Sequence, residues 1–347
     1  MLTFKERTAE FWRWYQEVAE RFYNTIEQNA CGELVEEVSD AVHRWTPGLA
    51  WVFGPGKDGG HSFTLSGEGV KPLQLLTDYW RRQAPEIPHW TFYSSRQPTP
   101  PELLKDFAIN IQDEEQVDTE GFLLKTSVVE ETEVLDVVAW HPTLEIVPEE
   151  HHLQLLFLLL DEALGEFGVQ TWLGDIKVEP FTPEESTKRL LELPEFIQQI
   201  EQYYQWRKIP PLESCSLYEL PRTLNARRGD TVVGATTIPN VVFDFLENDG
   251  KLPENPYEEL GAEFAYVALD GALFPKGKQR EVRGEFEDAI GEALEAEQSG
   301  QVLGGAFGTS ESYIDLLLLD GERSRRLVTE KLEKLQLLGR FRIESFL

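Results

Sequence analysis

Cysteine and long apolar runs are both scarce in this sequence. Cys31 and Cys215 are the only cysteines among 347 residues, so no disulfide framework is possible and a reducing compartment fits. The longest apolar run, Leu155 to Leu160, is far shorter than the roughly 20 residues of a membrane-spanning helix. The first residues mix acids and bases without the apolar segment of a secretory leader. We therefore expect a cytoplasmic protein with no membrane contact.

Basic residues are also in short supply. The chain has 32 Lys and Arg against 62 Asp and Glu, a net charge of −30. Residues 101–200 hold 23 acids and five bases, a net of −18, whereas residues 301–347 hold seven of each. Such a field repels phosphate backbones, so direct nucleic-acid binding is not expected. It attracts a basic protein surface, although acidity that serves only solubility is the alternative.

The motifs of common catalytic and cofactor sites are missing. The sequence has no Gly-x-Ser-x-Gly, His-x-x-x-His or Cys-x-x-Cys pattern. The glycine-rich segment 54–60 lacks the Lys-Ser/Thr pair of a phosphate-binding loop, because Asp58 follows Lys57. A hairpin turn is the better interpretation. We expect no catalytic residue, cofactor or metal site. Whether the chain is an enzyme stays open, although the missing motifs favour a protein that is not one.

Arg222, Arg227 and Arg228 form the one local basic patch that could hold an anion or a partner. A guanidinium group binds carboxylate or phosphate through paired N–H donors. In so acidic a chain, salt bridges within the fold are the more plausible use of these residues.

Four tryptophans form a candidate aromatic surface: Trp12, Trp14, Trp80 and Trp90. Trp12 and Trp14 cannot share one face of a helix, so at least one ring should be partly exposed or packed at a domain joint. Filling of the core is the alternative, and it is the commoner use of aromatic side chains.

The pattern of apolar residues predicts an α+β fold with a repeated ββαβ unit. Residues 1–97 predict an α-α-β-β-α-β unit, and residues 102–208 a second β-β-α-β unit followed by a long helix over 184–208. Helix 149–167 and strand 169–178 are expected within this second unit. The proline-rich segments 98–101 and 209–211 are expected to be joints, because proline lacks a backbone donor and restricts the preceding residue.

Residues 212–347 predict a third domain. Its part from Glu263 to Phe346 follows the order β-α-β-β-α-β, which is the ferredoxin-like order. We expect a four-stranded antiparallel sheet with two helices on one face. Strand Tyr313–Leu319 should be central, because its apolar side chains point to both faces.

Three segments resemble a bacterial family known as domain of unknown function 695. They are Phe-Trp-Arg-Trp-Tyr at 11–15, Thr-Pro-Gly-Leu at 46–49 and Ala-Pro-Glu-Ile-Pro-His-Trp at 84–90. The ferredoxin-like part resembles the inhibitor B of ribonuclease E in the order of its elements. The resemblance implies a shared fold and supplies no catalytic residue.

These features together favour a non-enzymatic, inhibitor-type binding protein that docks a basic protein partner. Two alternatives remain. One is an enzyme with a cleft between domains, lined by carboxylates or by the arginine patch. The other is a structural or assembly subunit with a large apolar surface patch.

Overall fold

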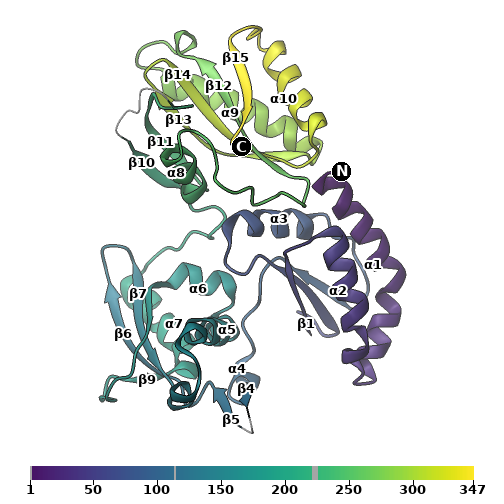
Figure 1. The fold of residues 1–347 in the computed structure, drawn as a ribbon, viewed down its shortest axis with the longest axis vertical. Helices are drawn as coiled ribbons and strands as arrows, with labels where there is room; N and C mark the ends of the chain where they lie inside the picture. The colour runs from purple at the N-terminus through teal and green to yellow at the C-terminus, as the bar shows by residue number, and fades with distance from the viewer. Residues whose placement is uncertain (1, 113–114, 221–225) are drawn as a thin grey trace. The chain divides into compact units, whose positions relative to one another are not determined.

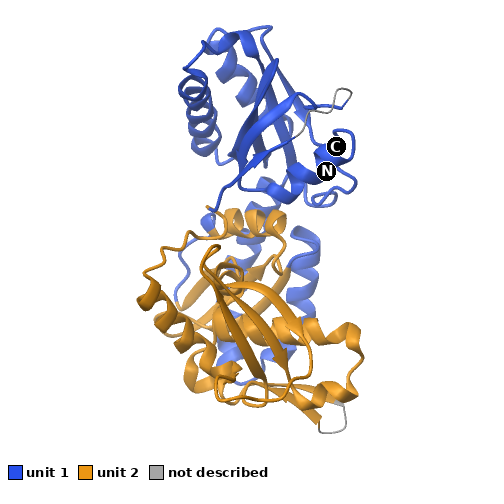
Figure 2. Cartoon of the chain, turned by 90° about the vertical axis from the view of Figure 1, so that its left-hand side faces the viewer, with its two compact units in different colours: residues 1–49, 82–88, 214–347 blue, residues 50–81, 89–213 orange. Residues whose placement is uncertain are grey.

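The computed structural model describes residues 2–112, 115–220 and 226–347, and it has the expected α+β composition (Figure 1). The chain forms two compact units, shown in two colours in Figure 2. Unit 1 contains residues 1–49, 82–88 and 214–347, and unit 2 contains residues 50–81 and 89–213. These units are divided differently from the three expected domains. The first expected domain, 1–97, contributes its helices mainly to unit 1 and its strands to unit 2.

Unit 1 is built on a six-stranded sheet in the order β10-β11-β13-β14-β12-β15. All its neighbouring strands are antiparallel. The strands are β10 (Ser216–Glu219), β11 (Thr231–Thr236), β12 (Glu263–Asp270), β13 (Gly300–Gly308), β14 (Glu311–Leu318) and β15 (Phe341–Ser345). The expected four-stranded antiparallel part with a central β14 is confirmed, and β10 and β11 extend it beside β13.

The two faces of this sheet are covered by different segments. Alternate residues of β12 and β14 share one core with α9 (Gln279–Ala296) and α10 (Glu322–Lys334), so both helices lie on one face as expected (Figure 1). On the other face, the ring of Phe245 in α8 (Pro239–Glu247) lies 5.8 Å from that of Tyr266 in β12. The second face is therefore an aromatic core.

Unit 1 also contains α1 (Phe4–Glu27), the short 3-10 helix η1 (Cys31–Leu34) and α2 (Val35–Trp45). A capping box formed by Thr3 and Glu6 begins α1 and satisfies backbone donors that the first turn leaves free. The backbone N–H of Phe4 donates to the carbonyl of Gly261 at 3.0 Å. The start of α1 is thereby attached to the segment that leads into β12.

Unit 2 contains two ββαβ arrangements in separate sheets. In the order β1-β2-β3, the first pair is antiparallel and β3 runs parallel to β2. In the order β8-β7-β6-β9, β6 and β7 are antiparallel and β8 runs parallel to β7. The elements of the first are β1 (Ala50–Pro55), β2 (His61–Ser66), α3 (Lys71–Arg82) and β3 (Trp90–Tyr93). Those of the second are β6 (Leu123–Val129), β7 (Val134–Trp140), α5 (His152–Leu164), α6 (Glu166–Trp172), β8 (Leu173–Val178), β9 (Lys188–Arg189) and α7 (Leu193–Tyr204).

Four smaller elements and a two-stranded sheet complete the described part of unit 2. They are α4 (Pro101–Leu104), the 3-10 helices η2 (Pro142–Ile146), η3 (Glu149–His151) and η4 (Leu190–Glu192), and the pair β4 (Ala108–Gln112) and β5 (Glu115–Asp118). Both proline-rich segments lie outside the interior of any helix or strand, as expected, and both fall within unit 2. Residues 98–100 lie in neither a helix nor a strand, Pro101 begins α4, and residues 209–211 are likewise irregular.

Three expected boundaries in unit 2 are wrong. The helix expected over 149–167 is interrupted at Gly165, where φ is +73° and an added Cβ would lie 2.9 Å from Pro98 Cδ. The chain remains helical to Trp172, so the strand expected from Val169 begins at Leu173. The long helix expected from residue 184 begins only at Leu193, because Lys188 first pairs with Leu124 of β6.

Candidate functional site

Two of the three arginines of the expected basic patch are described, Arg227 on the surface and Arg228 in the interior. Arg222 lies outside the described residues. Arg227 donates to the carbonyl of Leu347 at 3.1 Å, and its guanidinium lies over the ring of Phe245. Arg228 is buried, with 4% of its surface exposed. Salt bridging within the fold, which was the alternative interpretation, describes Arg228 correctly.

Arg228 and Asp315 form a buried ion pair beneath the second face of the unit 1 sheet. Nη1 of Arg228 donates to Oδ1 of Asp315 at 2.5 Å, and both side chains are fully buried. Asp315 lies opposite Tyr266 in the β12–β14 register. The guanidinium carbon is 5.0 Å from the ring of Tyr266 and 4.7 Å from that of Tyr313. Cation–π contacts with these two rings therefore stabilise its positive charge.

The ionisation of this pair follows from its surroundings. Burial lowers the pKa of Arg228, but the carboxylate of Asp315 and the nearby tyrosines raise it, and the net direction is upward. Arg228 also has a positive φ of +59°, a backbone conformation that is uncommon for a residue with a side chain. The turn is therefore held in place by what the side chain binds.

A pocket of about 320 Å³ opens beside this pair, between the turns at 226–230 and 309–311. Asp230 lines it and accepts from the backbone N–H and the hydroxyl of Ser310, both at 2.8 Å, and from the hydroxyl of Tyr313. Burial raises the pKa of Asp230, but these donors lower it more, so its net shift is downward. Its carboxylate is thus committed to the turn.

The remaining charges at the pocket also have partners within the fold. Arg342 donates through Nη2 to Glu311 at 3.0 Å and through Nε to Glu344 at 2.8 Å. Together with the bonds of Arg227 and Arg228, these contacts account for each charged group that lines the pocket. The arrangement is suited to holding two turns against the sheet.

The expected aromatic surface is wrong for three of its four members. Trp12, Trp80 and Trp90 are buried, and Trp14 is half-buried with its ring 5.5 Å from that of Trp45. In unit 2, the Trp80 ring packs 6.0 Å from Phe63. Filling of the core, the alternative interpretation, is confirmed for these three rings.

The buried carboxylate of Glu166 ties together the loops of unit 2. Glu166 at the start of α6 accepts from four donors: the hydroxyl of Ser66 (2.8 Å), the backbone N–H of Gly69 (2.9 Å), the side-chain amide of Gln74 (2.6 Å) and the backbone N–H of Arg96 (3.2 Å). One turn earlier, burial raises the pKa of Asp161 to about 7, and the charge of Glu166 adds to the rise. The cluster is structural, because its polar atoms bind the chain itself.

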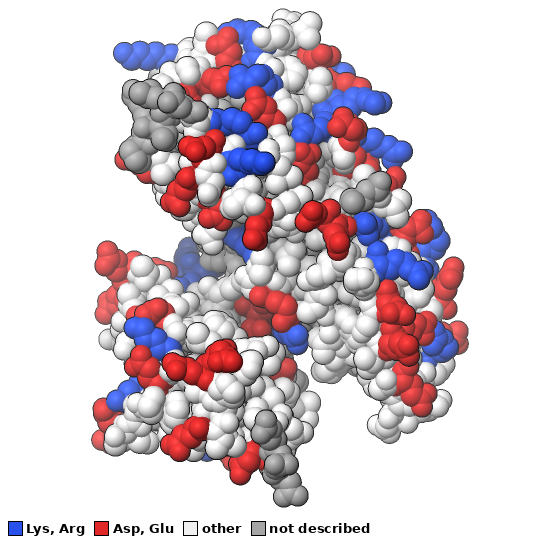
Figure 3. All heavy atoms as spheres, viewed as in Figure 1, with Lys and Arg blue, Asp and Glu red and all other residues white. Residues whose placement is uncertain are grey.

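A different feature of unit 2 is a run of sequence that exposes acidic side chains to solvent. Residues 126–176, called here the acidic stretch, contain 11 acids and no Lys or Arg over 51 positions. They form most of β6, all of β7, α5 and α6, and most of β8. Acidic side chains outnumber basic ones on the face of unit 2 that Figure 3 shows. Five glutamates of the stretch are exposed and make no ion pair within the described residues: Glu130, Glu131, Glu145, Glu149 and Glu150.

Sequence reasoning missed this stretch as a unit, although the signal was available. The net of −18 over residues 101–200 located the charge only coarsely, whereas the gap between Lys125 and Lys177 marks its boundaries. Among the described residues, no group of three or more His, Cys, Asp or Glu is placed to hold a metal ion. Within those same ranges, every helix is too short or too polar to cross a bilayer.

Comparison with known proteins adds no neighbour: no family model, no curated protein and no solved structure matches this chain.

Proposed function

We propose that this chain is a non-enzymatic binding protein that docks a basic protein surface on the acidic stretch of unit 2. The observation that carries the proposal is the set of five exposed glutamates without an ion pair, in a stretch that has no Lys or Arg. The proposal places this binding in the cytoplasm, as the scarcity of cysteine suggests.

The physical reason is electrostatic. Exposed like charges repel one another, and a partner that brings Lys and Arg replaces this repulsion by attraction. Such a field also steers the partner during diffusion and raises the association rate. The pocket in unit 1 supports the enzyme alternative less well, because its charged groups already have hydrogen-bond partners within the fold.

The resemblance to the family of domain of unknown function 695, and to the inhibitor B of ribonuclease E, belongs to the same proposal. It suggests that the docked partner is an enzyme that the chain inhibits. The third alternative, an assembly subunit that uses exposed tryptophans, loses support because Trp12, Trp80 and Trp90 are buried.

A pull-down with two charge-matched variants tests the proposal. The first variant changes four glutamates of the acidic stretch to glutamine: Glu130, Glu131, Glu149 and Glu150. The control makes the same change at four exposed glutamates of α9 in unit 1: Glu281, Glu285, Glu292 and Glu295. Each full-length protein captures partners from a lysate of its source cells at about 20 mM and about 150 mM salt.

We expect the wild type and the α9 control to retain the same basic protein at low salt, and the acidic-stretch variant to lose it. Retention should fall at the higher salt, because screening weakens the attraction. If no basic protein is retained at low salt, or if both variants retain it equally, the proposal is wrong.

A further inference from the structure

The C-terminal end of α7 carries an exposed ladder of aromatic rings. Tyr203 is 80% exposed, and its ring centroid lies 4.8 Å from that of Tyr204. Tyr204 in turn stacks on Trp206, with the centroids 5.0 Å apart and the planes 27° from parallel. A single exposed aromatic side chain is ordinary on a protein surface. Tyr203 differs because its ring contacts that of Tyr204, which in turn stacks on Trp206.

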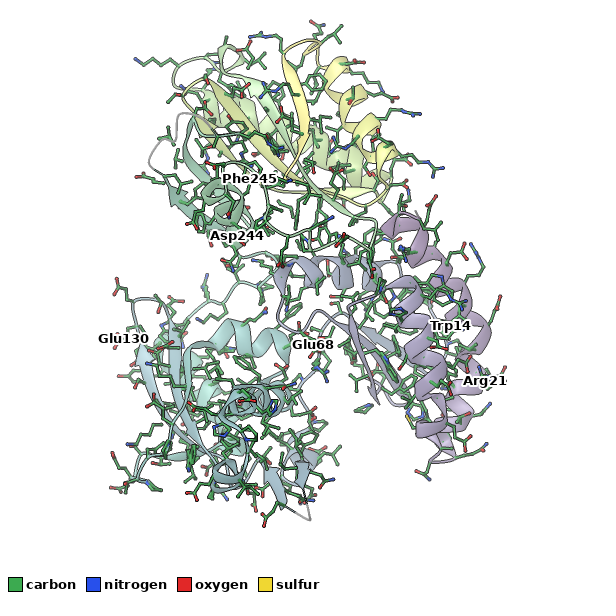
Figure 4. The ribbon with its side chains drawn as sticks, in the orientation of Figure 1. Trp14, Arg21, Glu68, Glu130, Asp244 and Phe245 are labelled. Carbon is green, nitrogen blue, oxygen red and sulfur yellow. The ribbon has the colours of Figure 1, made fainter. Side chains whose placement is uncertain are left out.

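A carboxylate of the acidic stretch lies beside this ladder. The hydroxyl of Tyr204 is 3.5 Å from Oε1 of Glu130, which is exposed at the end of β6 (Figure 4). Glu131, which is also exposed, follows Glu130 in the chain. Aromatic faces bordered by carboxylates attract a cation in two ways, through the ring quadrupole and through charge.

The inner side of the ladder already binds a cation of the chain itself. The ammonium of Lys208 lies 5.0 Å from the ring of Trp206 and 5.1 Å from that of Trp172, and it donates to the carbonyl of Glu133. Burial lowers the pKa of Lys208, and the charge of Glu133 opposes this shift. The cluster thus has the composition of a cation site. Lys208 occupies the side formed by Trp206 and Trp172, whereas the ring of Tyr203 is exposed to solvent.

We propose that Tyr203 is the anchor on which an arginine side chain of the basic partner stacks, with Glu130 facing its charge. Arginine fits better than lysine, because its planar guanidinium stacks on an aromatic face and donates to carboxylates at the same time. A second copy of this chain would bring the same acids to the surface, so the occupant is a protein segment of opposite charge. This inference rests on the proposed function and names the contact at its centre.

Binding of labelled hexa-arginine and hexa-lysine peptides, followed by fluorescence anisotropy at about 20 mM salt, tests the anchor. The full-length wild type is compared with Tyr203→Ala, Tyr203→Phe and a control, Leu217→Ala, whose side chain is 84% exposed in unit 1. We expect Tyr203→Ala to weaken hexa-arginine binding about three- to fivefold, which is the size of an exposed cation–π contact. Tyr203→Phe and Leu217→Ala should bind as the wild type does, and hexa-lysine should bind more weakly.

The outcomes separate the two proposals. If Tyr203→Ala binds hexa-arginine as tightly as the wild type, the anchor is wrong, and the docking function stands or falls on the pull-down. Equal affinity for the two peptides overturns the preference for arginine. If the wild type binds neither peptide at low salt, the acidic docking function itself is contradicted.

Discussion

Replacing Asp315 with leucine is expected to lower the free energy of unfolding of unit 1 by about 3–5 kcal/mol. The change leaves the guanidinium of Arg228 buried without its carboxylate, because both side chains are fully buried. The rings of Tyr266 and Tyr313 cannot replace a charge-assisted hydrogen bond of 2.5 Å. Chemical denaturation followed by circular dichroism measures the loss.

The double variant Arg228→Met with Asp315→Leu is the matched control. It removes both charges and fills the space with apolar side chains, so it should recover most of the stability that Asp315→Leu loses. A single variant that costs less than about 1 kcal/mol would mean that water reaches the pair, and the buried ion pair would not be what holds the turn at Arg228.

Replacing Glu166 with alanine should lower the free energy of unfolding of unit 2 by about 3 kcal/mol or more. The carboxylate accepts from Ser66, Gly69, Gln74 and Arg96, and its removal leaves buried donors unsatisfied. Glu166→Gln keeps the shape and one acceptor oxygen but turns a donor towards other donors, so its cost should be intermediate.

Thermal melts of the two Glu166 variants, with Glu162→Gln on the neighbouring helix as a control, measure the order of these effects. Glu162 is half-buried and, in the part of the chain that the structure describes, accepts from one side chain, the hydroxyl of Thr99, so its change should lower the melting temperature less. Equal stability of Glu166→Ala and the wild type would contradict the structural role of this cluster.

The order of helices and strands could be predicted from the sequence where one local pattern decided it. Helix α1 begins at a Thr-x-x-Glu capping box and buries Phe11 and Tyr15 one turn apart, so its period was visible. The start of α7 was not visible, because Lys188 is held by pairing with Leu124, which lies 64 positions earlier in the chain. Long-range strand pairing leaves no local signal.

The candidate sites were predictable to a different degree, because sequence shows charge but not burial. Arginine and tryptophan are residue types typical of surface sites, yet Arg228 and Trp80 are both buried. Asp315, the partner of Arg228, lies 87 positions further along the chain. The absence of Lys and Arg from 126–176 needs no structure to be seen. The structure adds that five of its glutamates are exposed and make no ion pair within the described residues.

The melting temperature as a function of salt concentration tests most directly whether the acidic side chains of unit 2 lack ion pairs within the fold and can therefore bind a basic partner. Unpaired acids repel one another at low ionic strength, and salt screens this repulsion within about 10 Å at 0.1 M. We expect the melting temperature of the wild type to rise by about 3 °C between about 10 and about 150 mM sodium chloride. The variant with glutamine at 130, 131, 149 and 150 should start higher and rise less, while binding of a basic partner to the wild type weakens over the same range. A melting temperature that falls as salt is added would mean that the acids are already paired within the fold, and would contradict the account.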